Sequence, residues 1–372
     1  MTAGSDIVVV GSGIIGCAIA YELGRRGASV LVLDDRTPGM GATQASAGML
    51  APYNEVDEEG PHLELTVRSL GLFDEFMAQL AADTSLTVPY RRTGTLTLAL
   101  DEAAHRRLER TANWLDKRGV AAAVLDRTAV LSEEPWASPH TRAGLLVHEH
   151  GYVGATALTA ALVAAAMSRR VQFCRSARPH SIRPQGSGVV ITSESAQVSA
   201  AHAIIAAGSW SGQIHVEGAT GPAPVHPVRG QLLQLKASGA NLRRVTWGER
   251  TYLVPWDDGS LLVGATVEHV GYDERTTVDG MRDLLDGVAK TLAPGWPATI
   301  VSGRAGLRPG TPDGLPIVGG SAGLPAVTYA TGHYRNGVLM APLTARLVAD
   351  VLLERRVDPL MLVMSPARFG GL

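Results

Sequence analysis

Cysteine and lysine are both scarce in this sequence of 372 residues. The chain has two cysteines, Cys17 and Cys174, and three lysines among its 33 basic residues. Two thiols are too few for a disulfide scaffold or for a zinc or iron–sulfur centre, so we expect no metal site and a reducing compartment, the cytoplasm. The 35 acidic residues leave a formal net charge of −2, which gives no reason to expect a nucleic-acid partner.

Long apolar runs and internal repeats are missing as well. No apolar stretch reaches the roughly 20 residues that a helix needs to cross a bilayer, so no membrane partner is expected. The chain is 45% hydrophobic, which at this length is enough for a sizeable core in more than one lobe.

The first 34 residues predict one complete βαβ unit. Residues 7–10 have the composition of a buried parallel strand, a helix should follow to about Arg26, and a second buried strand should end at Asp34. Between strand and helix lies a G-x-G-x-x-G motif whose glycines are Gly11, Gly13 and Gly16. These glycines permit the tight turn, the close approach of a pyrophosphate and the packing of helix on strand, while the acid about 20 residues on accepts ribose hydroxyls.

The pattern along the rest of the chain predicts a second, β-rich lobe. Helical spacing is expected at 62–82, 102–118, 156–169, 278–292 and 337–355, and strands are expected at 95–100, 171–174, 189–192, 204–206, 230–235, 252–255 and 261–264. The βαβ unit needs further parallel strands, for which those near 171, 189 and 204 are the candidates. We therefore predict an α/β fold with a discontinuous Rossmann-type dinucleotide-binding domain (1–84, 140–222 and 302–372) and an inserted antiparallel-β substrate domain (85–139 and 223–301).

Two further segments favour FAD over NAD. Residues 41–48 form a loop of small side chains directly after the ribose acid, where a long cofactor can lie close to the backbone. Residues 204–210 form an apolar strand that runs into Ala-Gly, which in many FAD enzymes closes the dinucleotide domain.

The sequence resembles the glycine oxidase and D-amino acid oxidase family of FAD-dependent flavoproteins over nearly its whole length. The matching motifs, in order, are Val10–Gly16, Ser46–Leu50, Ala207–Gly212, Val228–Gln231, Tyr252–Pro255, Leu262–Thr266, Ala305–Thr311 and Gly332–Gly337. This set is specific because the motifs keep both their order and their register.

The resemblance implies where the cofactor and substrate bind. Tyr252 and Arg308 resemble the pair that holds a substrate carboxylate, and Arg335 resembles a further active-site arginine. An arginine fork and a tyrosine hydroxyl also suit a carboxylate on chemical grounds. Met49 should lie near the flavin ring, and residues 332–339 should pass beside the isoalloxazine. The expected cofactor contacts are Gly11, Gly13, Ile14, Ile15, Gly16, Asp34, Asp35, Ala42, Thr43, Gln44, Ser46, Ala47, Gly48, Met49, Ala207, Gly208, Trp210, His333, Tyr334, Arg335, Asn336, Gly337 and Val338.

Departures from the family pattern touch the expected substrate entrance. Arg250 stands where some members carry a histidine, and Ala51, Asn54 and Val267 are the other candidates for the substrate pocket. If Arg250 lies on a strand it shares a face with Tyr252, where it can meet a second carboxylate. The alternative is a solvated hairpin arginine in an arginine-rich protein.

The resemblance implies an oxidase that uses non-covalently bound FAD. Such an enzyme transfers a hydride from the α-carbon of glycine or an N-substituted glycine, such as an N-carboxymethyl amino acid, to flavin N5. The imine then hydrolyses to glyoxylate and amine, and O2 becomes H2O2. The alternatives are a D-amino acid or sarcosine dehydrogenase that uses another electron carrier, a flavin-binding module without catalysis, and an NAD enzyme. The partners expected are thus an amino acid substrate and O2; the sequence leaves a homo-oligomer open, although family members are often tetramers.

Overall fold

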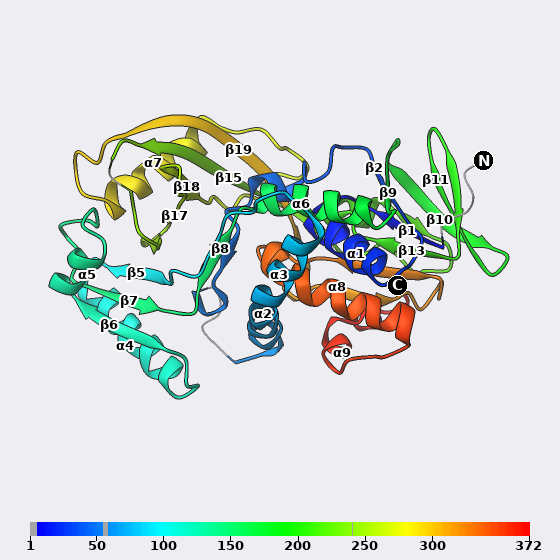
Figure 1. Ribbon diagram of the computed structural model, residues 1–372, viewed down its shortest axis with the longest axis horizontal. Coiled ribbons are helices and arrows are strands. Elements are labelled where there is room, and N and C mark those ends of the chain that lie inside the picture. The colour runs from blue at the N-terminus through cyan, green and yellow to red at the C-terminus, as the bar shows by residue number, and fades with distance from the viewer. Residues whose placement is uncertain (1–5, 55–58, 240) are drawn as a thin grey trace.

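The computed structural model describes residues 6–54, 59–239 and 241–372. Two sheets dominate the molecule and lie toward opposite ends of its long axis (Figure 1). None of the helices in these ranges is long and apolar enough to cross a membrane.

The six-stranded sheet is the dinucleotide-binding layer. Its strand order is β20-β21-β13-β1-β2-β9, and all its pairs are parallel except β20 with β21. The strands are β1 (Ile7–Val10), β2 (Val30–Asp34), β9 (Gln172–Arg175), β13 (His202–Ile205), β20 (Ile317–Gly320) and β21 (Val327–Thr331).

Both faces of this sheet are covered, which explains the unbroken apolar run of β1. Ile7 and Val9 pack into a core shared with the helices, whereas Val8 and Val10 pack into a core shared with a small second sheet. The helices on the first side are α1 (Ile14–Arg25), α6 (Ala155–Ser168) and α8 (Gly337–Glu354). The small sheet contains β10 (Pro179–Gln185), β11 (Gly188–Ser193), β12 (Gln197–Ala200) and β14 (His215–Val216).

The eight-stranded sheet forms the other lobe. Its order is β19-β15-β18-β17-β16-β5-β7-β6, and only the pair β16 with β5 is parallel within the described residues. Its strands are β5 (Thr95–Ala99), β6 (Ala122–Asp126), β7 (Ala143–Val147), β15 (His226–Ala237), β16 (Val245–Trp247), β17 (Tyr252–Pro255), β18 (Ser260–Gly264) and β19 (Ala298–Gly310). Among the helices that pack on this lobe are α4 (Glu102–Asp116) and α7 (Val278–Thr291).

Shorter elements complete the chain. A three-stranded sheet of β3 (Met49–Leu50), β8 (Gly151–Val153) and β4 (Tyr90–Arg91) lies between the two lobes (Figure 1). The remaining helices are α2 (Pro61–Gly71), α3 (Phe73–Asp83), α5 (Arg127–Glu133) and α9 (Leu360–Met364), and the 3-10 turns are η1 (Ala42–Ala45), η2 (Pro52–Asn54), η3 (Gly208–Gln213) and η4 (Pro366–Phe369).

The predicted fold class, an α/β flavoprotein fold with a separate, mostly antiparallel sheet, is confirmed. Two details of the prediction are wrong. The strand near 189 is β11 of the small sheet and not part of the parallel sheet. The single helix expected over 62–82 is interrupted at Leu72, so the structure has two helices there.

The division into domains stays a prediction. Sheet membership bears on one of its boundaries, since β7 pairs with β5 and β6 although its residues follow position 140. By this criterion residues 143–147 belong with the larger sheet.

Candidate active site

A large cavity lies at the carboxyl edge of the six-stranded sheet and extends to the eight-stranded sheet. Val10 and Thr331, the last residues of β1 and β21, line it from the first sheet. Tyr252 and Arg308 line it from the second. Ligands of open α/β sheets bind in this position, beyond the carboxyl ends of the parallel strands.

The turn between β1 and α1 is shaped to hold an anion close to the backbone. Gly11 has φ +108°, and a Cβ added there would lie 2.4 Å from the carbonyl oxygen of Ala206, so only glycine fits. No side chain caps the helix at Gly13, and Thr43 Oγ1 accepts a hydrogen bond from Ile14 N at 3.1 Å. The N-terminal end of α1 therefore presents its positive dipole to the cavity, which suits a pyrophosphate.

Asp34 ends β2 and organises the same turn. Its Oδ2 accepts hydrogen bonds from Ser12 N at 2.6 Å and Ser12 Oγ at 2.7 Å, and its Oδ1 accepts one from Arg36 N at 2.9 Å. The carboxylate thus ties the glycine-rich turn to the second strand while it also lines the cavity.

An arginine–tryptophan stack lies at the same end of the cavity. The guanidinium carbons of Arg36 and Arg178 lie 4.3 Å and 5.0 Å from the Trp210 ring centroid. Arg178 also donates to Asp35 Oδ2 at 2.8 Å. Although burial acts to raise the pKa of Asp35, the hydrogen bond and charge of Arg178 outweigh it and the pKa lies below its ordinary value. Arg36 donates twice to Glu274, at 2.9 Å and 2.8 Å.

The segment between β21 and α8 lines the cavity on another side. His333 is fully enclosed there, its Nε2 lies 3.0 Å from Thr344 Oγ1, and burial lowers its pKa to about 3. This histidine is therefore neutral at physiological pH. Arg335 is exposed, with its guanidinium 5.5 Å from the Tyr334 ring centroid.

The two expected carboxylate-binding residues are close to the backbone of β15 and β18. Arg308 Nη1 donates to the carbonyl oxygen of Thr266 at 2.9 Å. A Cβ added at Gly230 would lie 2.2 Å from Arg308 Nη2, and one added at Gly264 would lie 2.3 Å from Tyr252 Oη. Arg308 itself belongs to β19.

Most residues expected at the site from the sequence line this one cavity. They are Gly11, Gly13, Ile14, Ile15, Asp34, Asp35, Ala42, Thr43, Ser46, Ala47, Gly48, Met49, Ala51, Ala207, Gly208, Trp210, Tyr252, Arg308, His333, Tyr334, Arg335, Asn336, Gly337 and Val338.

Five candidates do not line it. Gly16 packs α1 against the turn, where a Cβ would meet the carbonyl oxygen of Gly11 at 2.0 Å, and Gln44 donates to Ala305 O at 2.7 Å. Asn54 donates to Thr97 Oγ1 at 3.1 Å, and Val267 is 45% exposed. Arg250 is exposed in the turn between β16 and β17, two residues before the strand begins. Arg250 thus lies in the hairpin turn, the alternative to a strand position, and its role in substrate binding stays a prediction.

Arg36 and Arg178 were missed by sequence reasoning. Neither belongs to a motif, and their common target, Trp210, is distant from both in the sequence. In an arginine-rich chain no local signal marks these two.

Comparison with known proteins agrees with this geometry. The model of the DAO family, described as FAD dependent oxidoreductase, matches residues 6–351. A bifunctional ThiO/ThiG protein from Nostoc sp. is 34% identical in an alignment of 368 residues that covers 96% of this chain and 54% of that protein. The chain thus spans about half the length of this bifunctional relative. A glycine oxidase from Geobacillus kaustophilus is 32% identical over 96% of this chain and 94% of its own.

Solved structures give the same result. A glycine oxidase structure from Geobacillus kaustophilus has a TM-score of 0.92 and 30% identity, and covers 99% of both chains. The iminodiacetate oxidase (IdaA) of Chelativorans sp. BNC1 has a TM-score of 0.85 and 25% identity, and covers 97% of this chain and 98% of its own. The present chain belongs to the FAD dependent oxidoreductase family.

Proposed function

We propose that this protein is an FAD-dependent oxidase of glycine or of a small N-substituted glycine. The observation that carries the proposal is that Arg308 and Tyr252 line the same cavity as the glycine-rich turn. A guanidinium and a phenol together offer a carboxylate a charged fork and a further donor. The similarity to glycine oxidases supports the same substrate class.

The residues of the cavity fit FAD. The N-terminal end of α1, where Gly13 carries no side chain, suits the pyrophosphate, and the small side chains of residues 41–48 leave the backbone accessible to a long ligand. When bound, FAD supplies the acceptor for the two electrons of an amine oxidation. We propose that it is held without a covalent bond, since neither Cys17 nor Cys174 lines the cavity.

The protein's own contribution is to bind and orient the substrate. Arg308 would take the carboxylate, and Tyr252 would donate a second hydrogen bond to it. Holding the carboxylate fixes the α-carbon relative to the cofactor, which lowers the entropic part of the barrier. Arg335, at the exposed side of the cavity, would be a further polar contact.

The proposed reaction needs no side chain of the protein as a general base. Among the described residues that line the cavity, the carboxylates Asp34 and Asp35 are engaged by Ser12 and Arg178, and His333 is a neutral, buried histidine. We therefore propose that the substrate reacts with its amine already neutral, its proton lost to water.

The position of Arg250 bears on the N-substituent of the substrate. The distal carboxylate of an N-carboxymethyl substrate would not meet Arg250, which lies outside the cavity. Iminodiacetate, which is N-carboxymethyl glycine, remains a candidate because an oxidase named for it shares the fold at 25% identity.

The test is oxidation by the purified yellow holoprotein under air. We expect glycine, sarcosine or iminodiacetate to give equal amounts of H2O2 and glyoxylate. Flavin reduction by substrate without H2O2 would instead indicate a dehydrogenase that uses another electron carrier. No flavin reduction by any of the three would contradict the proposed substrate class.

A further inference from the structure

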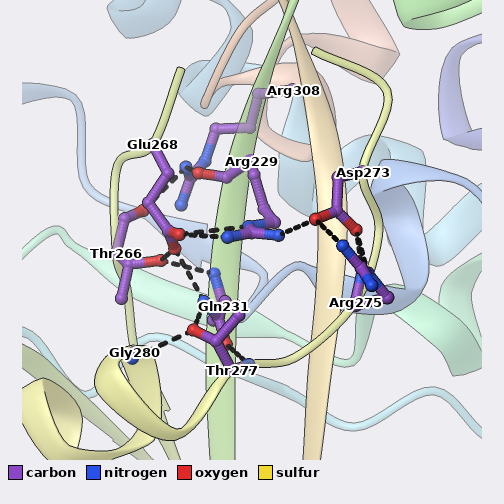
Figure 2. Close-up of polar contacts among 9 residues, drawn as sticks. All are labelled: Arg229, Gln231, Thr266, Glu268, Asp273, Arg275, Thr277, Gly280 and Arg308. Carbon is purple, nitrogen blue, oxygen red and sulfur yellow. Dashed lines mark hydrogen bonds and ion pairs between the residues drawn. The ribbon is translucent and has the colours of Figure 1, made fainter. Parts of the chain in front are cut away.

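Arg229, on β15, is a buried cation beside the Arg308 site (Figure 2). Its side chain is 5% exposed. Its Nε and Nη2 both donate to Glu268 Oε2, the first at 3.1 Å. Its Nη1 lies 2.9 Å from Asp273 Oδ2, an ion pair without the alignment of a hydrogen bond. A buried guanidinium thus lies between two carboxylates.

The segment from Thr266 to Glu268 connects Arg229 to Arg308. Glu268 N donates to Arg229 O at 3.0 Å, and Arg229 N donates to Glu268 O at 2.9 Å. The Thr266 hydroxyl donates to Glu268 Oε1, and the Thr266 carbonyl accepts from Arg308 Nη1. Arg308 Nη1 also lies 3.4 Å from Arg229 O. The position of Glu268 therefore affects the carbonyl that holds Arg308.

Gln231 fixes the same segment from another direction. Its backbone N donates to Thr266 Oγ1 at 2.9 Å, and its Nε2 donates to Glu268 Oε1 at 2.8 Å. Its Oε1 accepts from Thr277 N at 2.8 Å, at the start of α7. Glu268 is thus held by Arg229, Thr266 and Gln231 together, as Figure 2 shows.

The charges explain why Arg229 matters to substrate binding. Burial acts to raise the pKa of Glu268, but the hydrogen bonds from Arg229, Thr266 and Gln231 outweigh it, so the pKa is lowered and the group is ionised near neutral pH. Asp273 has a second cationic partner, because Arg275 donates to it at 2.9 Å and 3.0 Å. Without Arg229, the ionised Glu268 would lose its cation while it remains bonded to Thr266, the residue whose carbonyl holds Arg308.

We propose that Arg229 is a positioning residue that keeps Glu268 paired, so that this carboxylate does not compete with the substrate carboxylate for the Arg308 guanidinium. This inference rests on the proposed role of Arg308. A buried carboxylate without its own cation would turn to Arg308 and compete with the substrate there.

The test uses the holoenzyme with Arg229→Gln, Glu268→Gln and the double variant. Glycolate, a carboxylate without an amine, serves as the binding probe, followed by the change in flavin absorbance. We expect Arg229→Gln to raise the KM for glycine and the Kd for glycolate about 30-fold, the size of a lost charged hydrogen bond. kcat should stay within about threefold, because the loss is in ground-state binding.

The double variant separates charge from structure. Removing the competing carboxylate should return both constants to within about fivefold of the wild type, although two buried groups are then changed. Arg229→Lys keeps the charge and serves as the second variant if Arg229→Gln folds poorly. It should raise the KM for glycine and the Kd for glycolate less than Arg229→Gln does. Arg282→Gln, which removes an exposed arginine paired with Asp279 on α7, is the matched control and should change neither constant.

Two sets of results would overturn the inference. Suppose that the double variant binds glycine and glycolate as weakly as Arg229→Gln, or that Arg229→Lys and Arg229→Gln bind them equally weakly. The proposal that Arg229 keeps Glu268 paired is then wrong, while the role of Arg308 stands. If the wild-type holoenzyme neither oxidises glycine nor binds glycolate, the proposed function fails and this inference fails with it.

Discussion

Tyr252, the first residue of β17, lies over Gly264 of the paired strand β18, and its ring occupies the space of the missing side chain. The two residues are direct cross-strand partners. A Cβ added at Gly264 would lie 2.2 Å from Tyr252 Cζ and 2.3 Å from its Oη. Gly230 makes the same kind of space for the Arg308 guanidinium. Both expected carboxylate-binding side chains are therefore packed against glycines of neighbouring strands.

The contact with Gly264 predicts a loss of substrate binding in Gly264→Ala. The methyl group would displace the Tyr252 ring, so we expect kcat/KM for glycine to fall about fivefold, which corresponds to the roughly 1 kcal/mol of one lost neutral hydrogen bond. Steady-state peroxide release measures the effect. Gly320→Ala is a suitable control, since Gly320 lies on β20 with nothing within 4 Å of its added Cβ. Equal activity of the two variants would show that Tyr252 is not held by Gly264.

The partly buried His202 predicts a loss of stability in acid. Burial lowers the pKa of His202 to about 4, and its Nε2 lies 2.9 Å from Thr328 Oγ1. Below pH 6.5 the unfolded chain binds a proton that the folded chain refuses, so stability falls as the pH drops from about 6.5 toward 4. Between pH 7 and pH 5 this one group should cost about 2 kcal/mol.

His202→Gln isolates that contribution, because glutamine keeps a hydrogen-bonding group without titrating. Urea unfolding at pH 7 and pH 5 should show a smaller loss of unfolding free energy in the variant than in the wild type. The same pH dependence in both proteins would contradict the burial argument for His202.

The flavin should be released by acid. Cys17 is buried in α1, where its Sγ donates to Ser12 O at 3.2 Å, and Cys174 is exposed on β9 outside the cavity. Precipitation of the holoprotein with trichloroacetic acid should leave the yellow colour in the supernatant. A yellow pellet after washing would indicate a covalent bond to another residue.

Arg250 should be dispensable for small substrates. It is exposed in the turn before β17 and does not line the cavity. Arg250→Ala should therefore leave kcat/KM for both glycine and iminodiacetate unchanged within about twofold, as for most surface substitutions. A loss confined to iminodiacetate would restore the idea that Arg250 meets a second carboxylate.

Local patterns predicted the fold where sequence neighbours determine the structure. The βαβ unit around Gly11 and Asp34 could be predicted because its strand, turn, helix and acid are contiguous. The strand near 189 was assigned to the wrong sheet because a short apolar run does not specify its partner strand. β20 and β21 were missed for a related reason, as glycines and small residues surround them.

The residues of the cavity that lie in sequence motifs could be predicted, and those outside the motifs could not. Its glycine-rich turn and the pair Tyr252 and Arg308 lie in motifs, and the structure brings them to one cavity. The stack of Arg36 and Arg178 on Trp210 could not be foreseen, since it joins three separate segments. The choice between a strand and a turn for Arg250 could not be made from sequence, because the alternation of residue types does not reveal that the hairpin turn extends to the residue before Tyr252.

The role of Arg308 in binding the substrate carboxylate is tested most directly by kcat/KM for glycine, measured by H2O2 release in the wild type and in Arg308→Ala. The variant should lose roughly 3 kcal/mol of transition-state binding, which is about 150-fold, because the substrate carboxylate loses its charged partner. Tyr252→Phe, which removes one neutral donor, should lose about 1 kcal/mol. Near-normal kcat/KM in Arg308→Ala, with the flavin still bound, would contradict the assignment of this cavity to a carboxylate-bearing amine.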